Sequence, residues 1–300
     1  MRAAVYTAAG APAEVLSVAD IDEPHAGPGR VRVAVRAAGV NPIDWKIVRG
    51  LTGKSPATPT VPGIDAAGVV DEVGEGVTGV RVGDAVFGQA AGGSAAEYAV
   101  LTAWATKPDS VPFEVAAGLP VTGETAVRVL DLLGLPSGAT VVVDGASGGV
   151  GIATVQVALA RGLTVVGTAG EGNQDFVRSL GALPTRHGPG LADRVRALAP
   201  GGVDGGVDTA GRGSVRDLIA LTGDPAKVVT IADFGAAELG VQVTGGGGGQ
   251  AERLARIAEL LADGRLQMPI AGTFPLERIG AAYAESEAGH VRGKLVLRVP

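Results

Sequence analysis

The sequence predicts an α/β protein with two domains, one β-rich and one built on a doubly wound parallel sheet. The chain has 300 residues, which is more than one small domain needs. Up to about residue 110, short segments rich in strand-forming residues are separated by Gly and Pro. From about residue 120, apolar strand-like runs alternate with helical segments, which is typical of a doubly wound domain.

The first part of the chain contains four expected strands. Residues 30–36 (RVRVAVR) alternate polar and apolar side chains with a period of two, as a half-buried strand does. Further short strands are expected at 66–73, 84–87 and 97–100. Short strands joined through turn residues predict a compact barrel or sandwich-like unit.

The second part begins with residues 140–143 (TVVV), an apolar run typical of a strand buried on both faces. The segments that follow alternate, with helices expected at 150–161, 174–180, 191–198 and 214–221, and strands at 163–167, 206–209 and 227–232.

The end of the chain is expected to return to the first domain. It carries two helical patterns and one strand pattern, at 250–263, 276–287 and 294–299. The predicted domain bounds are residues 1–118 completed by 266–300, and residues 119–265, which leaves the 250–263 helix at the end of the second domain.

Composition excludes several function classes. Hydrophobic residues make up 46% and charged residues 19%, and no apolar run approaches the roughly 18 residues of a membrane-spanning helix. The net charge of −6 disfavours a nucleic-acid partner. The absence of Cys excludes disulfides, thiolate metal sites and Cys nucleophiles. The amino end lacks the apolar core of a secretory signal, so we expect a cytoplasmic protein without a membrane partner.

The strongest chemical motif follows the 140–143 strand. Residues 145–151 read GASGGVG and open a helix. Small residues at such a turn let the backbone approach a pyrophosphate, and the helix amino terminus offers N–H groups to it. Ala146 in place of the usual first glycine is a mild departure. We expect a nicotinamide dinucleotide here rather than a purely structural turn, with contacts from Ala146, Ser147, Gly148, Gly149, Val150 and Gly151.

The residues after the second strand of this part indicate which nicotinamide cofactor is expected to bind. Thr168 stands where NAD-specific sites place an acidic residue for the ribose 2′-hydroxyl. A neutral residue leaves room for a 2′-phosphate, which favours NADPH. Glu171 acts against this choice, and we interpret the next cation, Arg178, as part of a solvated helix face. Asn173, beside them, is a further expected cofactor contact.

Several stretches resemble one family, and they occur in that family's order from end to end. They are AAGVNPIDWKIVRG (37–50), VPGIDAAGVVDEVGEGVTGVRVGDAVFG (61–88), AAEYAV (95–100), GASGGVG (145–151), GTAGEGNQDFVRSLGA (167–182) and GHVRGKLVL (289–297). The chain resembles the medium-chain dehydrogenase/reductase superfamily, and within it the zinc-free quinone oxidoreductases related to zeta-crystallin. The resemblance implies a GroES-like catalytic domain and a Rossmann-type domain, with the cofactor in the cleft between them.

Compared with the zinc-dependent relatives, this chain lacks the metal ligands. Asn41 stands in place of the first catalytic Cys and Ile64 in place of the His, and no Cys can supply a third ligand. Without a Lewis acid, a good acceptor must take hydride readily by itself. Quinones and α,β-unsaturated carbonyls do so because conjugation spreads the developing negative charge. We therefore expect a metal-free, NADPH-dependent reductase of such compounds.

The resemblance also assigns individual residues. In zinc-free relatives the residue at Asn41 lines the nicotinamide cleft, where its amide could donate to a developing oxyanion; the alternative is that Asn41 only shapes a turn. Thr122 is expected to contact the cofactor, to cap its helix, or both. Phe234 and Lys294 are placed near the cofactor by resemblance alone. Asp44 is expected to cap the helical turn after Asn41.

Other functions stay open at this stage. The same fold serves as an enoyl reductase or tailoring enzyme of secondary metabolism, and a redox-inactive NADPH-binding regulatory protein is an alternative of another class. A hydrolase is excluded because Ser147 has no His partner, and we expect His25, His187 and His290 at the surface. Residues 240–244 (GVQVT) look like an exposed edge strand, which favours a homodimer.

Overall fold

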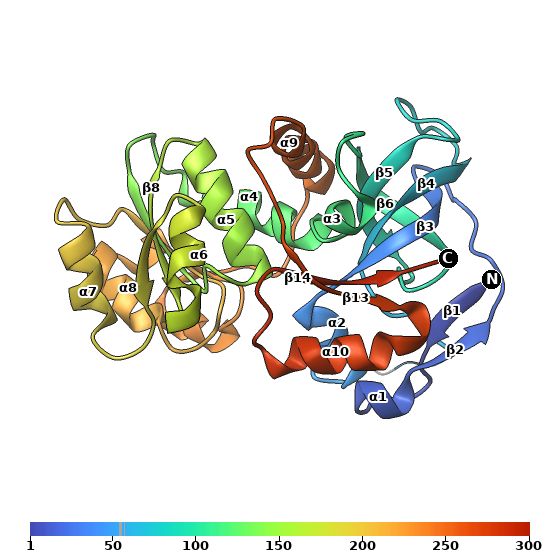
Figure 1. The fold of residues 1–300 in the computed structure, drawn as a ribbon, viewed down its shortest axis with the longest axis horizontal. Helices are drawn as coiled ribbons and strands as arrows, with labels where there is room; N and C mark the ends of the chain where they lie inside the picture. Colours follow the sequence, from blue (N-terminus) through green and yellow to red (C-terminus); the bar gives the residue numbers. More distant parts are fainter. Residues whose placement is uncertain (54–55, 57) are drawn as a thin grey trace. The chain divides into compact units, whose positions relative to one another are not determined.

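The computed structural model describes residues 1–53, 56 and 58–300, which form two compact units (Figure 1). The first unit contains Met1–Val121 and Gln250–Pro300, and the second contains Thr122–Gly249. The predicted return of the chain to its first domain is thus observed, but with a different boundary. Helix α9 (Gln250–Ala262) packs on strand β6 of the first unit, whereas the predicted boundary placed it in the second. Its amphipathic pattern predicts an apolar face without saying which sheet covers it.

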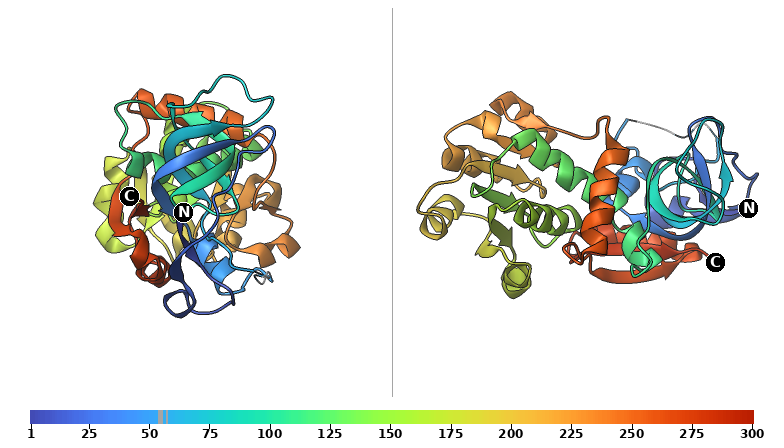
Figure 2. Two further views of the ribbon diagram at one scale, coloured as in Figure 1. Left: turned by 90° about the vertical axis from the view of Figure 1, so that its right-hand side faces the viewer. Right: turned by 90° about the horizontal axis from the view of Figure 1, so that it is seen from above.

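The sheet of the first unit curls until it closes on itself. Its order is β13-β14-β3-β4-β5-β6, and β3 additionally pairs with β6 (Figure 2). The first half of β3 pairs with β6 and its second half with β14, while β4 runs along both halves. The strands are β3 (Val31–Val40), β4 (Asp65–Val73), β5 (Ala85–Ala91), β6 (Tyr98–Thr106), β13 (Ile270–Pro275) and β14 (Lys294–Arg298).

Short helices and a hairpin complete the first unit. Helix α10 packs on α1 and α2, and its buried residues join the Val-rich inner face of β3 in one apolar core. The sequence patterns did not predict α1, the strands β1 and β2, or α3, because each spans only four or five residues. The elements are β1 (Arg2–Val5), α1 (Pro12–Val15), β2 (Ser17–Asp20), α2 (Pro42–Val48), α3 (Phe113–Ala117) and α10 (Ile279–Ala288).

The second unit has the predicted doubly wound arrangement. Its sheet is parallel throughout, in the order β12-β11-β10-β7-β8-β9. The chain adds strands on one side of β7 first and then on the other, so the strand order reverses between β7 and β10. Ligands of such sheets bind at this reversal, beyond the carboxyl ends of the strands. The strands are β7 (Thr140–Asp144), β8 (Thr164–Ala169), β9 (Leu183–Arg186), β10 (Gly205–Asp208), β11 (Val228–Thr230) and β12 (Gln242–Val243).

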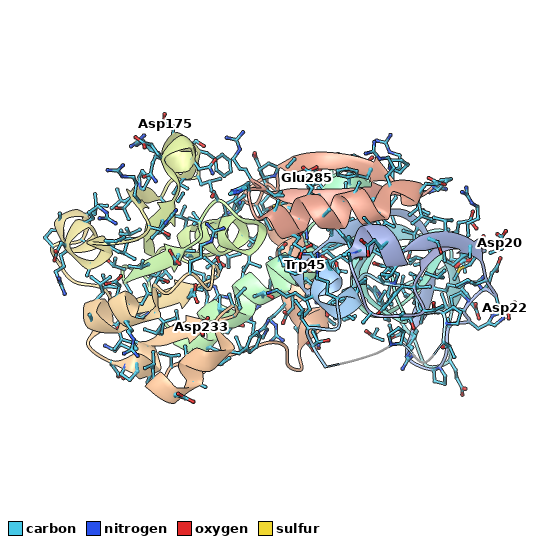
Figure 3. All side chains as sticks on the ribbon, turned by 90° about the horizontal axis from the view of Figure 1, so that it is seen from below. Asp20, Asp22, Trp45, Asp175, Asp233 and Glu285 are labelled. Carbon is cyan, nitrogen blue, oxygen red and sulfur yellow. The ribbon has the colours of Figure 1, made fainter. Side chains whose placement is uncertain are left out.

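Helices cover both faces of this sheet. Helices α5 and α6 lie on one face, and α4 and α8 on the other (Figure 2). Asp175, on α6, points into solvent at the outer surface (Figure 3). The helices are α4 (Pro120–Leu133), α5 (Gly149–Ala160), α6 (Gln174–Ser179), α7 (Leu191–Leu198) and α8 (Val215–Thr222), with the 3₁₀ turns η1 (Glu171–Asn173) and η3 (Phe234–Leu239).

Two further expectations from the sequence concern an edge strand and membrane-spanning helices. The expected strand 240–244 lies at the sheet edge, but only Gln242–Val243 pair as β12, since Gly240 adopts a left-handed conformation (φ 80°) that ends η3. None of the helices in the described part of the chain combines the length and apolar composition that a membrane crossing requires.

Candidate active site

The end of strand β3 places Asn41 at the start of helix α2. Gly39 lies opposite Asp65 in the β3–β4 register, and a Cβ at Gly39 would stand 2.2 Å from the carbonyl oxygen of Ala117. Only glycine therefore lets α3 pack this closely on the strand. Pro42 then opens α2, a position that suits proline because its missing N–H needs no partner there. Asp44 Oδ2 accepts a hydrogen bond from the backbone nitrogen of Asn41 at 2.8 Å, which confirms the predicted cap.

The side chain of Asn41 belongs to a buried network. Its Nδ2 donates to Asp65 Oδ2 at 2.9 Å, and its Oδ1 accepts from Lys294 Nζ at 2.6 Å. Lys294 Nζ also donates to the carbonyl oxygen of Val40 at 2.6 Å. Asn41 is 1% exposed and Lys294 3% exposed. The structure thus brings together two predicted site residues that lie 253 positions apart in the sequence.

The role of Asp65 had no sequence signal beyond its place after Ile64. It is fully buried, and its Oδ2 lies 3.9 Å from Lys294 Nζ. Its other oxygen, Oδ1, accepts from the backbone nitrogen of Val121 at 2.9 Å, in the first turn of α4. A carboxylate is favoured at that place because the amino end of a helix carries a partial positive charge.

Burial perturbs the charges of this network. It raises the pKa of Asp44 to about 7, with the negative charge of Asp65 as the second cause. Burial lowers the pKa of Lys294, while Asp65 and Asp44 oppose that shift. Burial also raises the pKa of Tyr283 well above its usual value, with Asp44 contributing. Oδ1 of Asp44 has no hydrogen-bond partner within the described residues. These shifts indicate that Asp44 holds a proton over part of the neutral range.

In the second unit, residues 145–151 form the predicted strand–helix turn. Gly145 adopts a φ of 83°, a conformation that favours glycine, and Gly148 precedes α5 without a side-chain cap on its first N–H groups. A Cβ at Gly151 would lie 2.1 Å from the Gly145 carbonyl oxygen, so this glycine is needed for packing. A Cβ at Gly148 would meet only that oxygen, at 3.5 Å. The uncapped helix end and the open space at Gly148 fit a bound pyrophosphate.

Thr168, near the end of β8, lies in buried polar surroundings. The residue is fully buried; its hydroxyl donates to Asp144 Oδ1 and accepts from the backbone nitrogen of Gly145 at 3.1 Å. Ser214 Oγ donates to the other Asp144 oxygen at 2.8 Å. The side chain of Thr168 therefore supports the turn, while the expected contact of Thr168 with the cofactor stays a prediction. Asp144 lies directly before the GASGGVG motif, but nothing in the pattern indicated this role.

Two exposed charged side chains, Glu171 after β8 and Arg186 at the end of β9, lie close together. Arg186 ends β9 in register with Ala169, the last residue of β8, and its Nη1 lies 3.7 Å from Glu171 Oε2. Arg194 donates to the carbonyl oxygens of Arg186, Gly188 and Pro189 and so fixes the loop after β9. A cation thus stands where the sequence analysis found none.

The remaining predicted contacts of the second unit are spread over several elements. Asn173 Nδ2 lies 3.5 Å from Ser147 Oγ, which brings these two together at the turn. Thr122 is buried on α4, and Phe234 is 62% exposed at the start of η3. The neighbours of Phe234, Asp233 (labelled in Figure 3) and Gly235, line a cavity of about 230 Å³.

The histidines and Arg178, which were predicted to lie at the surface, are exposed. His25, His187 and His290 are exposed. Arg178 is exposed and pairs with Asp175 on its own helix, as a solvated face would. Within residues 1–53, 56 and 58–300, no group of three His, Cys, Asp or Glu side chains is arranged to hold a metal ion.

Comparison with known proteins links both units to one family. Residues 27–110 match the alcohol dehydrogenase GroES-like domain, and residues 190–297 match the zinc-binding dehydrogenase family. A quinone oxidoreductase of Coxiella burnetii shares the fold over 100% of this chain and 99% of its own, with a TM-score of 0.84 and 28% identity. An NAD-dependent alcohol dehydrogenase covers 100% of both chains, with a TM-score of 0.87 and 32% identity. A mycobacterial protein solved with NADPH also covers both chains fully, with a TM-score of 0.86 and 27% identity.

Curated relatives include single enzymes and parts of much larger ones. The polyketide synthase protein NorB of Streptomyces orinoci is 34% identical over 91% of this chain, which spans 13% of NorB. The rat quinone oxidoreductase is 38% identical over 57% of this chain and 53% of its own length. The chloroplast envelope quinone oxidoreductase homolog of Arabidopsis thaliana is 31% identical over 99% of this chain and 98% of its own. With a relative of that identity matched over nearly its whole length, the chain belongs to the quinone oxidoreductase family of the medium-chain dehydrogenases/reductases.

Proposed function

We propose that this protein reduces a quinone or an α,β-unsaturated carbonyl with NADPH and without a metal. The observation that carries the proposal is the position and the hydrogen bonding of the Asn41 side chain. It stands in place of a metal ligand, and its amide is held by Asp65 and Lys294. One hydrogen of Nδ2 is bonded to Asp65, and the second makes no hydrogen bond within the described residues. The site thus offers an amide donor rather than a Lewis acid.

This donor fits acceptors that already spread their charge. The nicotinamide, when bound, supplies the hydride. The turn at 145–151 would hold the pyrophosphate through the first N–H groups of α5, and Asn41 would donate to the oxygen on which negative charge develops. A single neutral donor stabilises less charge than a metal ion does. A conjugated acceptor is therefore the matching substrate class.

The proposed preference for NADPH over NADH is supported by a residue that the sequence patterns did not indicate. It rests on Arg186, an exposed cation at the end of β9 and opposite the last residue of β8, since an arginine near this place accommodates a 2′-phosphate. Glu171 competes for the same guanidinium, so we expect a modest preference. The comparisons support either cofactor, because one neighbour was solved with NADPH and another is named NAD-dependent.

A direct experiment tests the proposal. Steady-state oxidation of NADPH and of NADH is measured against a panel of quinones, enones and simple aldehydes, with elemental analysis of the same sample. Turnover of conjugated acceptors with NADPH in metal-free protein is expected. Near-stoichiometric zinc with loss of activity on chelation would refute the metal-free mechanism. Titration calorimetry in which NADH binds as tightly as NADPH would refute the cofactor assignment.

A second candidate function is reduction of an enoyl thioester. It is favoured by the match to NorB and by a 33% identity to the pikromycin synthase component PikAII of Streptomyces venezuelae over 91% of this chain. An enoyl thioester is also a conjugated acceptor, so the proposed chemistry is the same. Adding a short enoyl thioester to the panel separates the two, because the better substrate shows the higher kcat/KM.

A further inference from the structure

Two groups of opposite hydrogen-bonding character hold the amide of Asn41. The ammonium of Lys294 can only donate, so it must face Oδ1, at 2.6 Å. The carboxylate of Asp65 can only accept, so it must face Nδ2, at 2.9 Å. An amide turned by 180° would set Nδ2 against the ammonium and Oδ1 against the carboxylate. These two partners therefore fix a single orientation of the amide.

The strand register brings the three residues together. Asp65 begins β4 opposite Gly39, and Lys294 begins β14 beside Leu295, the register partner of Val40. Lys294 Nζ is tied to the strand end itself through the carbonyl oxygen of Val40. The two partners of Asn41 thus come from the strands on both sides of β3.

We propose that Lys294 and Asp65 are positioning residues that act through Asn41 and aim its second Nδ2 hydrogen at the substrate oxygen. The proposal rests on the proposed function. It also gives Lys294 a different role from the cofactor contact that the family resemblance implied. Two donors of its ammonium are used by Val40 and Asn41, and Asp65 lies 3.9 Å away.

A double-mutant cycle on kcat tests the proposal. Lys294→Met removes the donor but keeps much of the side-chain length, and Asn41→Ala removes the amide. We expect each single variant to lower kcat by about ten- to a hundred-fold, less than the loss of a well-preorganised oxyanion donor. The double variant should be no slower than Asn41→Ala, since Lys294 then has nothing to orient. Effects that multiply in the double variant would overturn the proposal.

The chain contains a matched control for the loss of a buried lysine. Lys107 is 7% exposed, and its Nζ donates to the carbonyl oxygens of Pro108 and Val111. Lys107→Met should lower the melting temperature as Lys294→Met does, with kcat unchanged. Equal losses of kcat in both variants would reduce the effect of Lys294 to general destabilisation and overturn the proposal.

Further variants keep the proposal testable if Lys294→Met does not fold. Lys294→Arg keeps a donor and should retain more kcat. In Asp65→Asn, the new amide oxygen can still accept from Val121, which leaves its NH₂ facing Asn41. Asn41 then meets donors on both sides, so kcat should fall to the level of Asn41→Ala. Wild-type kcat in Asp65→Asn would overturn the proposal.

Binding measurements separate this proposal from the proposed function. The Kd of NADPH, measured by calorimetry, should agree within about twofold between wild type and Lys294→Met. A large loss of NADPH affinity would indicate that Lys294 contacts the cofactor and would overturn the positioning role. A wild-type protein that neither binds NADPH nor reduces any conjugated acceptor would refute the proposed function itself, and this proposal with it.

Discussion

Replacing Asp44 by asparagine should remove a pH dependence from the stability of the first unit. The pKa of Asp44 is raised from 3.8 to about 7, so the folded protein binds its proton more tightly than the unfolded chain. The stability that this proton contributes is fully present below pH 3.8 and is lost as the pH rises towards 7. The side chain of the Asp44→Asn variant carries no charge, and its amide oxygen can still accept from the backbone nitrogen of Asn41.

The magnitude follows from the shift. Between about pH 5 and pH 7, the unfolded chain has lost this proton while the folded protein still holds it, so stability falls by about 1.4 kcal/mol per pH unit. The stability of Asp44→Asn relative to wild type should therefore increase by roughly 3 kcal/mol between pH 5 and pH 8. The carboxyl group belongs to a residue that is 1% exposed, so solvent screens this effect little.

The assay can observe the first unit alone. The only two tryptophans of the chain, Trp45 on α2 (Figure 3) and Trp104 on β6, both lie in this unit. Urea unfolding followed by tryptophan fluorescence at pH 5, 6, 7 and 8 gives the free energy of unfolding for each variant. Asp109→Asn, at an exposed aspartate, is the control and should keep the wild-type dependence on pH. A stability difference between Asp44→Asn and wild type that is constant over this range would refute the reasoning.

The other predictions concern the second unit. Gly148→Val should fold with an unchanged melting temperature yet lose NADPH binding in calorimetry, because its Cβ has room in the protein but lies where the pyrophosphate is expected to approach. Gly151→Ala should destabilise the unit by about 2 kcal/mol or more, because its Cβ would stand 2.1 Å from a backbone oxygen. Thr168→Asp should lower the melting temperature without shifting preference towards NADH, since it sets a second buried carboxylate against Asp144. The protein should be a homodimer joined at the β12 edge, and light scattering that shows only monomer at micromolar concentration would contradict this.

The sequence predicted the second unit well because its signals are local. The apolar run before residue 145 and the small residues after it specify strand, turn and helix within one stretch, and the structure shows β7 and α5 at those places. Helix α9 was expected in the end of the chain that returns to the first domain, but the boundary at 265 left it in the second, because amphipathicity does not name the covering sheet. The hydrogen bonds of Thr168 could not be predicted for a similar reason. Its position along the strand was predictable, but the direction of its hydroxyl depends on Asp144, which is 24 residues away.

Asn41 shows the same limit within the candidate site. Its position could be aligned with that of a metal ligand, and Lys294 was placed near the site by resemblance. Their contact could not be predicted, because it depends on the register of β3 with β14, across 253 residues. Asp65 had only its place after Ile64 as a signal, since a lone buried carboxylate at the start of a strand is recognisable only from its partners.

The charge balance of this network bears on the class of substrate. One lysine and two aspartates are buried around Asn41, and Asp44 titrates near neutral pH. With Asp44 protonated, the charges of Lys294 and Asp65 offset each other, so the network presents an amide dipole rather than a net positive charge. A localised alkoxide would gain little from such a donor, whereas an enolate or a hydroquinone anion needs little help because its charge is spread. For the proposed reduction of these acceptors, an amide donor therefore serves best when it is held in one orientation, which is the arrangement that Lys294 and Asp65 enforce.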